Sequence, residues 1–463
     1  MRRADFAQLL IRATKWCEID NLRAALIWSF GPGGDASIGV ALAAASTPVW
    51  LEASLLGECE SSTEKALANI AGSQRGTRDE MVLQSALGFS LMFTKGMTSN
   101  AHAALTRAAE LAGSFSDSDY HLRALNSLCS FHLRVGDFRG ALAVARQCEA
   151  AQLINEPVAT PTADWTLGVS LYFLGEYASA RTHLERVLRR PISATRRADM
   201  VRFGFDQRVN ALGALAITRW LQRFPGDALQ ISQISVDEAQ TLEHPISLCM
   251  ALAWAGSIIA LRTGDIVSAR RYAEILADRA EKHALTTYRA CGLAIEGVLS
   301  AKGGDPDAAV ELLRVSLDGM REGRYYIFYT MFLCDLAEVL SAAGRFDESF
   351  TAVDEALERA TRNEELWFLR EALRIKGELD LLKSVQRFAA VAEDHFLQSL
   401  ALARRQGALS WELRSVISLA RLWLSQDRSG DARELLAPVY DRFTEGFDTA
   451  DLKAAKALIE EIR

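Results

Sequence analysis

The chain has 463 residues, a formal net charge of −7, 49% hydrophobic residues and 24% charged residues. This balance excludes a disordered chain, which would be poorer in apolar residues and richer in charge. The acidic excess argues against a dedicated nucleic-acid-binding protein, because such proteins present a basic surface to the phosphate backbone. The low proline content of 9 residues, with abundant Ala and Leu, favours long helices over strands.

The seven cysteines are odd in number and form no C-x-x-C motif, so buried free thiols in a reducing cytoplasm are the simplest interpretation. The N-terminal residues contain no uninterrupted apolar signal core. Two uncharged stretches, residues 36–51 and 245–261, fall short of the roughly 20 residues that a membrane span needs. We therefore expect a cytoplasmic protein without a membrane span.

Helical segments along the chain are separated by short turns that contain Gly, often followed by Asp. Taking one turn residue from each gives Gly57, Gly96, Gly136, Gly175, Arg223, Gly264, Gly304, Gly344 and Asp427. The steps between them are 39, 40, 39, 48, 41, 40, 40 and 83 residues. The step of 48 predicts an insertion near residues 190–202, and the step of 83 spans two periods with an irregular repeat near residues 380–400.

A second pattern supports this register. The residue five positions after each of the nine turn residues is Ala or Ser, and a small residue lies seven positions before seven of them. The exceptions are Trp50 and Phe89, of which Phe89 follows Gly88 directly. Small side chains on both helices let two antiparallel backbones approach closely near a tight turn. This pattern is typical of the tetratricopeptide repeat, with a period here nearer 40 than 34 residues.

The predicted fold is therefore all-α. We expect a right-handed superhelical solenoid of about nine to ten tetratricopeptide-like helical hairpins, in which each hairpin buries a face only against its neighbours. Residues 1–34 would form N-terminal helices at the leading edge, and residues 35–463 one continuous solenoid.

The motifs of common chemistries are missing from the sequence. The chain contains no Gly-Lys pair and hence no phosphate-binding loop, and it has no G-x-S-x-G motif. No two of the seven histidines are spaced as metal ligands on one helix. We expect a protein that is not an enzyme, with no catalytic residues, cofactor or metal.

Aromatic and basic residues are the candidate binding residues. The first helix of each hairpin would line the concave face, which could place Trp165, Tyr172, Trp220 and Trp254 in a groove, although packing between hairpins is the alternative. Seven arginines fall within residues 186–208, and Arg202 and Arg208 are the chosen candidates for an anion or acidic-partner site. The alternative is a solvated segment whose arginines pair with carboxylates.

Several segments resemble the C-terminal helical region of bacterial signal-transduction ATPases, regulators related to the maltose-regulator type with tetratricopeptide sensor regions. The matching segments are residues 18–26 (EIDNLRAAL), 202–208 (RFGFDQR), 244–249 (HPISLC), 373–379 (LRIKGEL), 405–414 (RQGALSWELR) and 418–423 (SLARLW). The resemblance implies a sensor or scaffold region. The ATPase, winged-helix and cyclase motifs of that family are missing, so neither ATP binding nor DNA binding is expected.

We expect a non-catalytic binding or sensor module of a bacterial transcriptional or signalling regulator. A protein partner or an effector would bind its concave face, with no direct contact to nucleic acid or membrane. The alternative is a receptor for a small, anionic molecule, in which the insertion near residues 190–202 forms one wall of the pocket. The sequence leaves the oligomeric state open.

Overall fold

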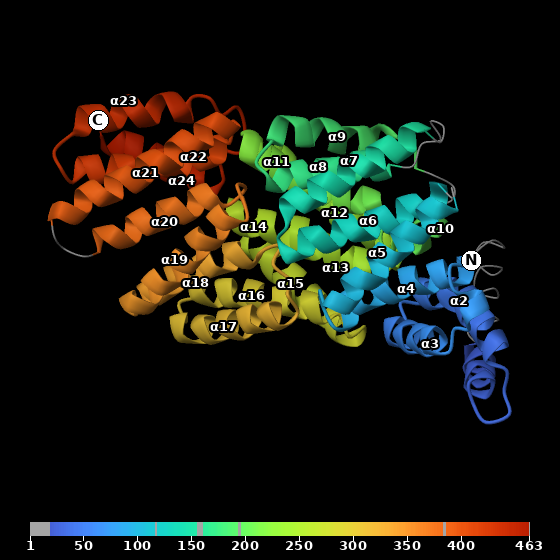
Figure 1. The fold of residues 1–463 in the computed structure, drawn as a ribbon. Coiled ribbons are helices and arrows are strands. Elements are labelled where there is room, and N and C mark those ends of the chain that lie inside the picture. The colour runs from blue at the N-terminus through green and yellow to red at the C-terminus, as the bar shows by residue number, and fades with distance from the viewer. Residues whose placement is uncertain (1–18, 116–117, 155–160, 193–195, 383–385, 463) are drawn as a thin grey trace, which may run out of the picture.

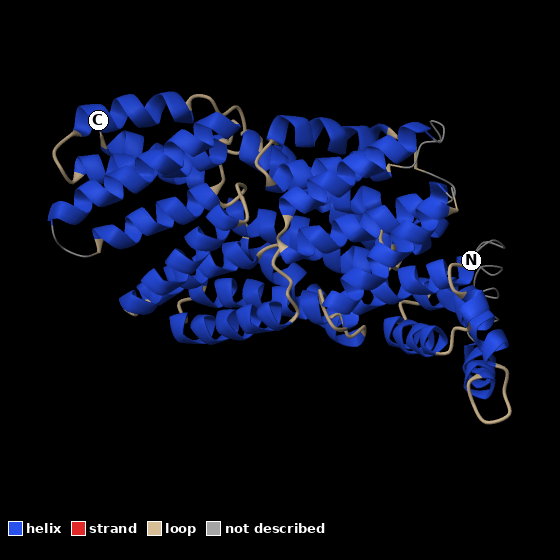
Figure 2. Cartoon of the chain, in the orientation of Figure 1, coloured by secondary structure: helices blue, strands red, loops and turns tan. Residues whose placement is uncertain are grey.

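The computed structural model describes residues 19–115, 118–154, 161–192, 196–382 and 386–462. These residues are helical apart from turns and loops, and none of them forms a strand (Figure 2). They form an all-α solenoid, as the sequence predicts.

Ten helical hairpins follow one another along the described chain (Figure 1). They are α2 (Ala36–Glu52) with α3 (Leu56–Ala68), α4 (Arg78–Thr94) with α5 (Ser99–Ser114), α6 (Ser118–Val135) with α7 (Phe138–Ile154), α8 (Thr162–Phe173) with α9 (Tyr177–Arg189), α11 (Gln207–Gln222) with α12 (Pro225–Leu242), the helix Pro245–Thr263 with α15 (Ile266–Lys282), α16 (Thr286–Lys302) with α17 (Pro306–Glu322), α18 (Tyr329–Ala342) with α19 (Phe346–Arg362), α20 (Leu369–Leu381) with α21 (Gln386–Gln406), and α22 (Leu409–Leu424) with α23 (Ser429–Tyr440).

A few elements stand outside this pattern. Residues 19–29 are helical, η1 (Gly72–Gln74) is a short 3₁₀ turn, α10 (Arg196–Phe203) lies in the segment of the expected insertion, and α24 (Ala450–Glu461) follows the last hairpin. The helix Pro245–Thr263 consists of α13 (Pro245–Met250), the π-helical segment η2 (Ala251–Ser257) and α14 (Ile258–Thr263).

The Gly-Asp turns explain how one helix ends and the next begins. Gly136 has φ +78°, and the following Asp137 donates its N–H to the carbonyl of His132 at 2.9 Å. This is the hydrogen bond of a helix end closed by a left-handed residue, where Gly costs least. The Asp137 carboxylate then accepts from the N–H of Gly140 at 2.8 Å, which caps the start of α7.

The register predicted from the turns needs correction in the first hairpin. Gly57 lies in the first turn of α3, and the left-handed residue of that turn is Ser54, with φ 55°. Counting from Ser54 puts Thr47 and Cys59, both buried, at the two helix-crossing positions. In the second hairpin Gly88 is the crossing residue, because a Cβ there would lie 2.6 Å from Leu105.

Successive turns of the superhelix touch each other through the backbone. The carbonyl of Arg134, at the end of α6, accepts from the N–H of Tyr326 at 2.6 Å, and that of Phe173, at the end of α8, accepts from the N–H of Trp367 at 3.2 Å. Two more such contacts join Thr286 Oγ1 to the carbonyl of Phe93 and Ser410 Oγ to that of Trp220. In each of the four, the donor lies 190–194 residues after the acceptor, which is five hairpins along the chain.

Aromatic rings fill the space that this winding encloses. Trp367 lies with its ring centroid 5.7 Å from both Tyr172 and Phe173 and 5.0 Å from Phe368. The chain of rings continues from Phe368 to Trp411, which is 4.9 Å from Trp220. These rings come from hairpins on both sides of the contact between turns, so one aromatic core joins the two turns. Figure 1 shows the C-terminal hairpins lying beside α9 and α11.

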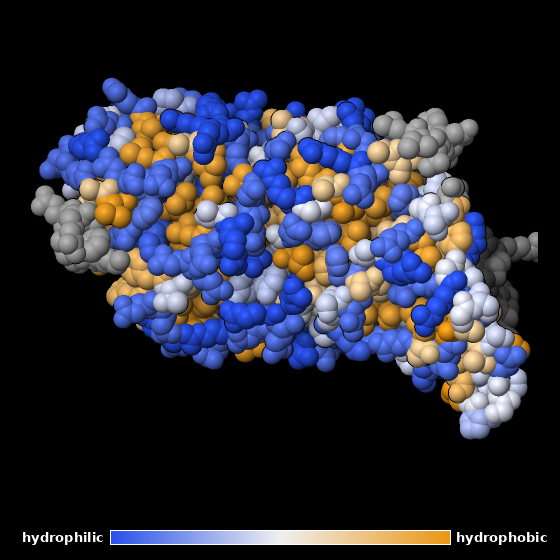
Figure 3. All heavy atoms as spheres, in the orientation of Figure 1, coloured by the Kyte–Doolittle hydropathy of each residue, from blue (hydrophilic) through white to orange (hydrophobic). Residues whose placement is uncertain are grey.

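The helix Pro245–Thr263 is long and apolar enough to cross a membrane, but 89% of its most apolar window is buried inside the protein. It is therefore accounted for as a core helix of the solenoid. The six cysteines of the described residues are buried and free, and Cys17 lies outside them. The outer surface, shown from one side in Figure 3, carries apolar residues in patches between charged ones.

We expect Gly96→Ala to destabilise the protein far more than Gly304→Ala. Both glycines have positive φ, so each Ala costs about 1–2 kcal/mol in backbone strain. A Cβ on Gly96 would lie 2.3 Å from the carbonyl oxygen of Gly323 in the next turn, whereas one on Gly304 meets nothing within 4 Å. The clash should add a further ~1–3 kcal/mol. Urea unfolding of the two variants measures the difference, and equal losses would contradict the contact between turns.

Candidate functional site

The four aromatic candidates lie in the interior of the protein. Trp165, Tyr172, Trp220 and Trp254 are each at most 4% exposed. The indole N–H of Trp165 donates to Oδ1 of Asn210 at 2.8 Å, so it is satisfied internally. Because the superhelix closes on itself, side chains on its inner face pack against the next turn. The structure therefore agrees with the alternative interpretation, in which these side chains pack between hairpins. Contact between them and a ligand stays a prediction.

The arginine-rich segment is paired with carboxylates. Arg208 contacts Glu238 at 3.3 Å and donates to the carbonyl of Leu188 at 2.8 Å, and Arg202 forms an ion pair with Asp119. The other pairs are Arg186 and Arg190 with Asp164, Arg189 with Glu185, Arg196 with Asp206 and Glu238, and Arg197 with Glu52. Arg202 and Arg208 therefore hold α10 and α11 in place, and they do not join the aromatic candidates in one site.

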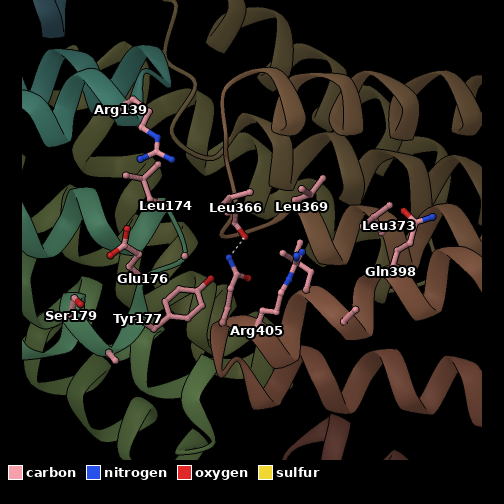
Figure 4. A pocket seen from close by; sticks show the side chains of 15 residues that line it. Arg139, Leu174, Glu176, Tyr177, Ser179, Leu366, Leu369, Leu373, Gln398 and Arg405 are labelled. Carbon is pink, nitrogen blue, oxygen red and sulfur yellow. Dashed lines mark hydrogen bonds between the residues drawn. The ribbon is translucent and has the colours of Figure 1, made fainter.

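A large groove opens where two superhelical turns meet on the outside of this core. It has a volume of about 980 Å³. One wall is the turn between α8 and α9 with the start of α9, and the other is the loop before α20 with the outer faces of α20 and α21 (Figure 4). A volume in this range suits a ligand that is largely enclosed.

Inter-turn contacts hold the floor of the groove. A guanidinium N–H of Arg370 donates to the hydroxyl of Tyr177, and both side chains are buried. Gln406 donates to the carbonyl of Leu366 at 3.5 Å (Figure 4). Its amide nitrogen would lie 1.9 Å from a Cβ on Gly175, so a larger residue there would displace the Gln406 side chain and would also strain the backbone at φ +77°.

The lining of the groove combines apolar side chains with three charged ones, Arg139 at the start of α7, Glu176 and Arg405. Leu366, Leu369 and Leu373 are half-buried along one wall, and the exposed Ala401 leaves open space beside them. Leu397, one helical turn before Ala401, is 44% exposed and extends the apolar surface.

Two exposed charges face the groove from opposite walls (Figure 4). Glu176 stands on the α9 wall and Arg405 on the α21 wall. Neither has an ion pair or a side-chain hydrogen bond within the described residues. Glu176 interacts electrostatically with Arg139, which also lines the groove and is itself paired with Glu364. Glu176 and Arg405 can therefore pair with a ligand without first breaking an ion pair.

Glu365 lies behind the groove wall and is fully buried. Burial raises the pKa of its carboxyl to about 7, although Arg359 and hydrogen bonds from the Thr330 hydroxyl and the Trp367 indole oppose the rise. The carboxyl anchors the loop that carries Leu366 and Trp367.

Among the described residues, no group of three or more His, Cys, Asp and Glu side chains could hold a metal ion.

The sequence does not predict the groove, because most of its residues come from hairpins four and nine and no pattern along the chain pairs these two hairpins. The sequence holds one weak signal of the groove: α20 carries more leucines than its single buried face needs.

Comparison with known proteins supports a tetratricopeptide-like region. Residues 161–186, which cover α8 and most of α9, match the tetratricopeptide repeat family. No curated protein sequence matches the chain. The APC/C hetero-tetramer Cut9-Hcn1 is similar in structure, with a TM-score of 0.53 and 13% identity over 81% of this chain and 63% of that chain. At this identity the likeness shows the fold alone.

Two further structures are more distant. A Rap protein complexed with competence and sporulation factor has a TM-score of 0.44 and 10% identity, over 86% of this chain and 99% of that chain. A signal transduction ATPase with a tetratricopeptide repeat sensor from Pyrococcus horikoshii has a TM-score of 0.42 and 11% identity, over 84% of this chain and 55% of that chain.

Replacing Trp254 by Ala should cost about 3–5 kcal/mol of stability, because it opens a cavity in the aromatic core. Trp254 is 4% exposed and its ring lies 5.2 Å from Phe328. Trp28 is 57% exposed, so Trp28→Ala serves as a control that should stay within about 0.5 kcal/mol of the parent. Denaturant unfolding of both variants tests the assignment, and a Trp254 variant as stable as the control would refute it.

Stability should fall as the pH rises from about 4.5 to about 7 through Glu365. With its pKa raised to about 7, the folded carboxyl keeps its proton in a range where the unfolded one has lost it. The folded state then binds more protons, so the loss over this range reaches up to ~3 kcal/mol. Urea titrations at several pH values should show a flatter dependence for Glu365→Gln. A dependence equal in both proteins would contradict this origin.

Proposed function

We propose that the chain is a non-catalytic binding module that takes an amphipathic helical segment of a protein partner into the groove between its superhelical turns. It would serve as the sensor or adaptor part of a bacterial signalling or transcriptional regulator in the cytoplasm. The observation that carries the proposal is the apolar groove between α9 and α20–α21, lined from two distant parts of the chain.

The shape and charge of the groove select the class of partner. Leu369 and Leu373 are four residues apart on one face of α20, and the exposed Leu397 and Ala401 have the same spacing on α21. The two helices, each with exposed or half-buried apolar residues, form a trough that a third helix can fill, as in helix-in-groove recognition. The partner helix should carry a basic residue opposite Glu176 and an acidic residue opposite Arg405.

Binding in this groove has a mechanical consequence. Its walls belong to hairpins four and nine, which meet only because the superhelix completes a turn. A partner that contacts both walls stabilises the closed winding over any more open one, and by linkage anything that opens the winding weakens binding. This property suits a sensor, because the winding of the superhelix and the occupancy of the groove depend on each other.

A receptor for a small anion is the second candidate function. A separate cavity beside α10, lined by Arg279 and Lys282, favours it.

Ala401→Trp should block the groove while leaving the protein folded, because residue 401 is exposed. The probe is a helical peptide selected from a displayed random library against the full chain. We expect its Kd to rise about tenfold or more in Ala401→Trp, the loss of about 1.4 kcal/mol of contact. Ala103→Trp, at an exposed position of α5 outside the groove, is the matched control and should bind as the parent does.

Charge reversal separates groove binding from adsorption to apolar surface. Arg405→Glu should weaken a selected peptide with an acidic residue at the facing position, and changing that residue to Lys should restore binding. Equal affinity for Ala401→Trp and Ala103→Trp, or a library that yields no binder to the folded chain, would refute the groove assignment.

A further inference from the structure

A second cavity, of about 710 Å³, lies beside α10 on the N-terminal side of the superhelix. Its walls are the ends of α2 and α12, the helix α10, the start of α13 and the end of α15. It shares no lining residue with the groove between turns. A test of one site therefore leaves the other untouched.

One wall of this cavity is rich in nitrogen donors. Arg279, Lys282 and His283 come from the end of α15, and His244 from the turn before α13. Lys282 is exposed and has no ion pair or hydrogen bond to any described residue. Arg279 has only its neighbour Asp278, at 3.7 Å, and both are well exposed, so this pair is weak.

The carboxylates of the lining are Glu52 and Glu243. Glu52 is neutralised by Arg197 of α10, whose Nε lies 3.2 Å from it. The cations at the end of α15 therefore face a lining with one other carboxylate, that of Glu243. These cations also affect His283. Burial and the positive charges of Lys282 and Arg279 lower the pKa of its ring.

His244 is oriented by its neighbours. It is 7% exposed, and its Nδ1 lies 3.3 Å from the backbone N of Ser247 and 2.9 Å from the Ser247 hydroxyl. The N–H of Asp206 donates to the same hydroxyl at 2.8 Å. The backbone N–H of Ser247 can donate only to an unprotonated ring nitrogen, so Nδ1 is an acceptor and the Ser247 hydroxyl donates to it. With Nδ1 accepting, the neutral ring carries its proton on Nε2, a donor without a partner among the described residues. Burial lowers the pKa of His244 to about 4, which keeps the ring neutral at pH 7.

Most of the remaining lining is apolar, with Ser54 and Gln240 as its polar residues. Val49, Met200, Leu242, Leu248 and Ile275 contribute from five different helices or their ends. Donors gathered on one side and aliphatic side chains on the others suit a molecule with an anionic head and an apolar body. We propose that this cavity binds a small amphiphilic anion, a carboxylate or phosphate monoester whose head meets Lys282, Arg279 and His244 and whose aliphatic part lies between α2, α10 and α13.

The experiment uses the full chain and the fluorescent amphiphilic anion 8-anilinonaphthalene-1-sulfonate as the probe. Octyl phosphate and octanoate should displace the probe, because they have both a charged head and an apolar body. Octan-1-ol lacks the charge and inorganic phosphate lacks the body, so neither should compete. Displacement by octan-1-ol as effective as that by octyl phosphate would overturn the anionic head, and displacement by inorganic phosphate would overturn the apolar body.

Matched variants locate the probe. Arg279→Glu with Lys282→Glu should weaken probe binding by about tenfold or more, because charge-assisted hydrogen bonds to the head are lost. Lys453→Glu with Lys456→Glu changes the net charge equally on exposed α24 with the same spacing, away from the cavity. It should bind the probe about as the parent does. Equal weakening by the two double variants would show that the probe senses only net charge and would overturn the site.

Discussion

The structure depends on the contact between one superhelical turn and the next. Four carbonyls near the ends of first helices accept hydrogen bonds from donors 190–194 residues further on, always five hairpins along the chain. An isolated helix end leaves its last carbonyls without partners, and here the following turn supplies them. A carbonyl left buried here without a partner would cost roughly 1–3 kcal/mol, so close packing of the two turns depends on these donors.

The other features follow from that closure. The inner face of the solenoid becomes an aromatic core, in which Trp367 joins Tyr172 and Phe173 of one turn to Phe368 of the other. The proposed binding surface lies outside this core, in the groove between the turns. Glycine is required where one backbone meets another between the turns, as at Gly96 against Gly323. Repeat proteins are often treated as one-dimensional, but contacts five repeats apart make this one cooperative across turns.

The repeat and the fold class could be predicted because they depend on local rules. Gly-Asp turns, small crossing residues and helical periodicity all act within about 40 residues, and even the misplaced turn at Gly57 was only three residues from Ser54. The groove depends on the small rotation between successive hairpins, summed over five of them, and no local pattern fixes that sum. Thus Trp165 and Trp254 were correctly assigned to the first helices of their hairpins, while Leu369 and Arg405 could not be brought together with Glu176.

The central claim is most directly tested by residue-resolved hydrogen exchange at the backbone amides of Tyr326 and Trp367. Both lie in loops and donate only to carbonyls of the preceding turn, at Arg134 and Phe173. The structure predicts exchange slower by orders of magnitude than at Asp347, an exposed first-turn amide of α19 without a backbone acceptor. Fast exchange at Tyr326 and Trp367, equal to that of Asp347, would show that the turns do not touch in solution and would contradict both the closed core and the groove.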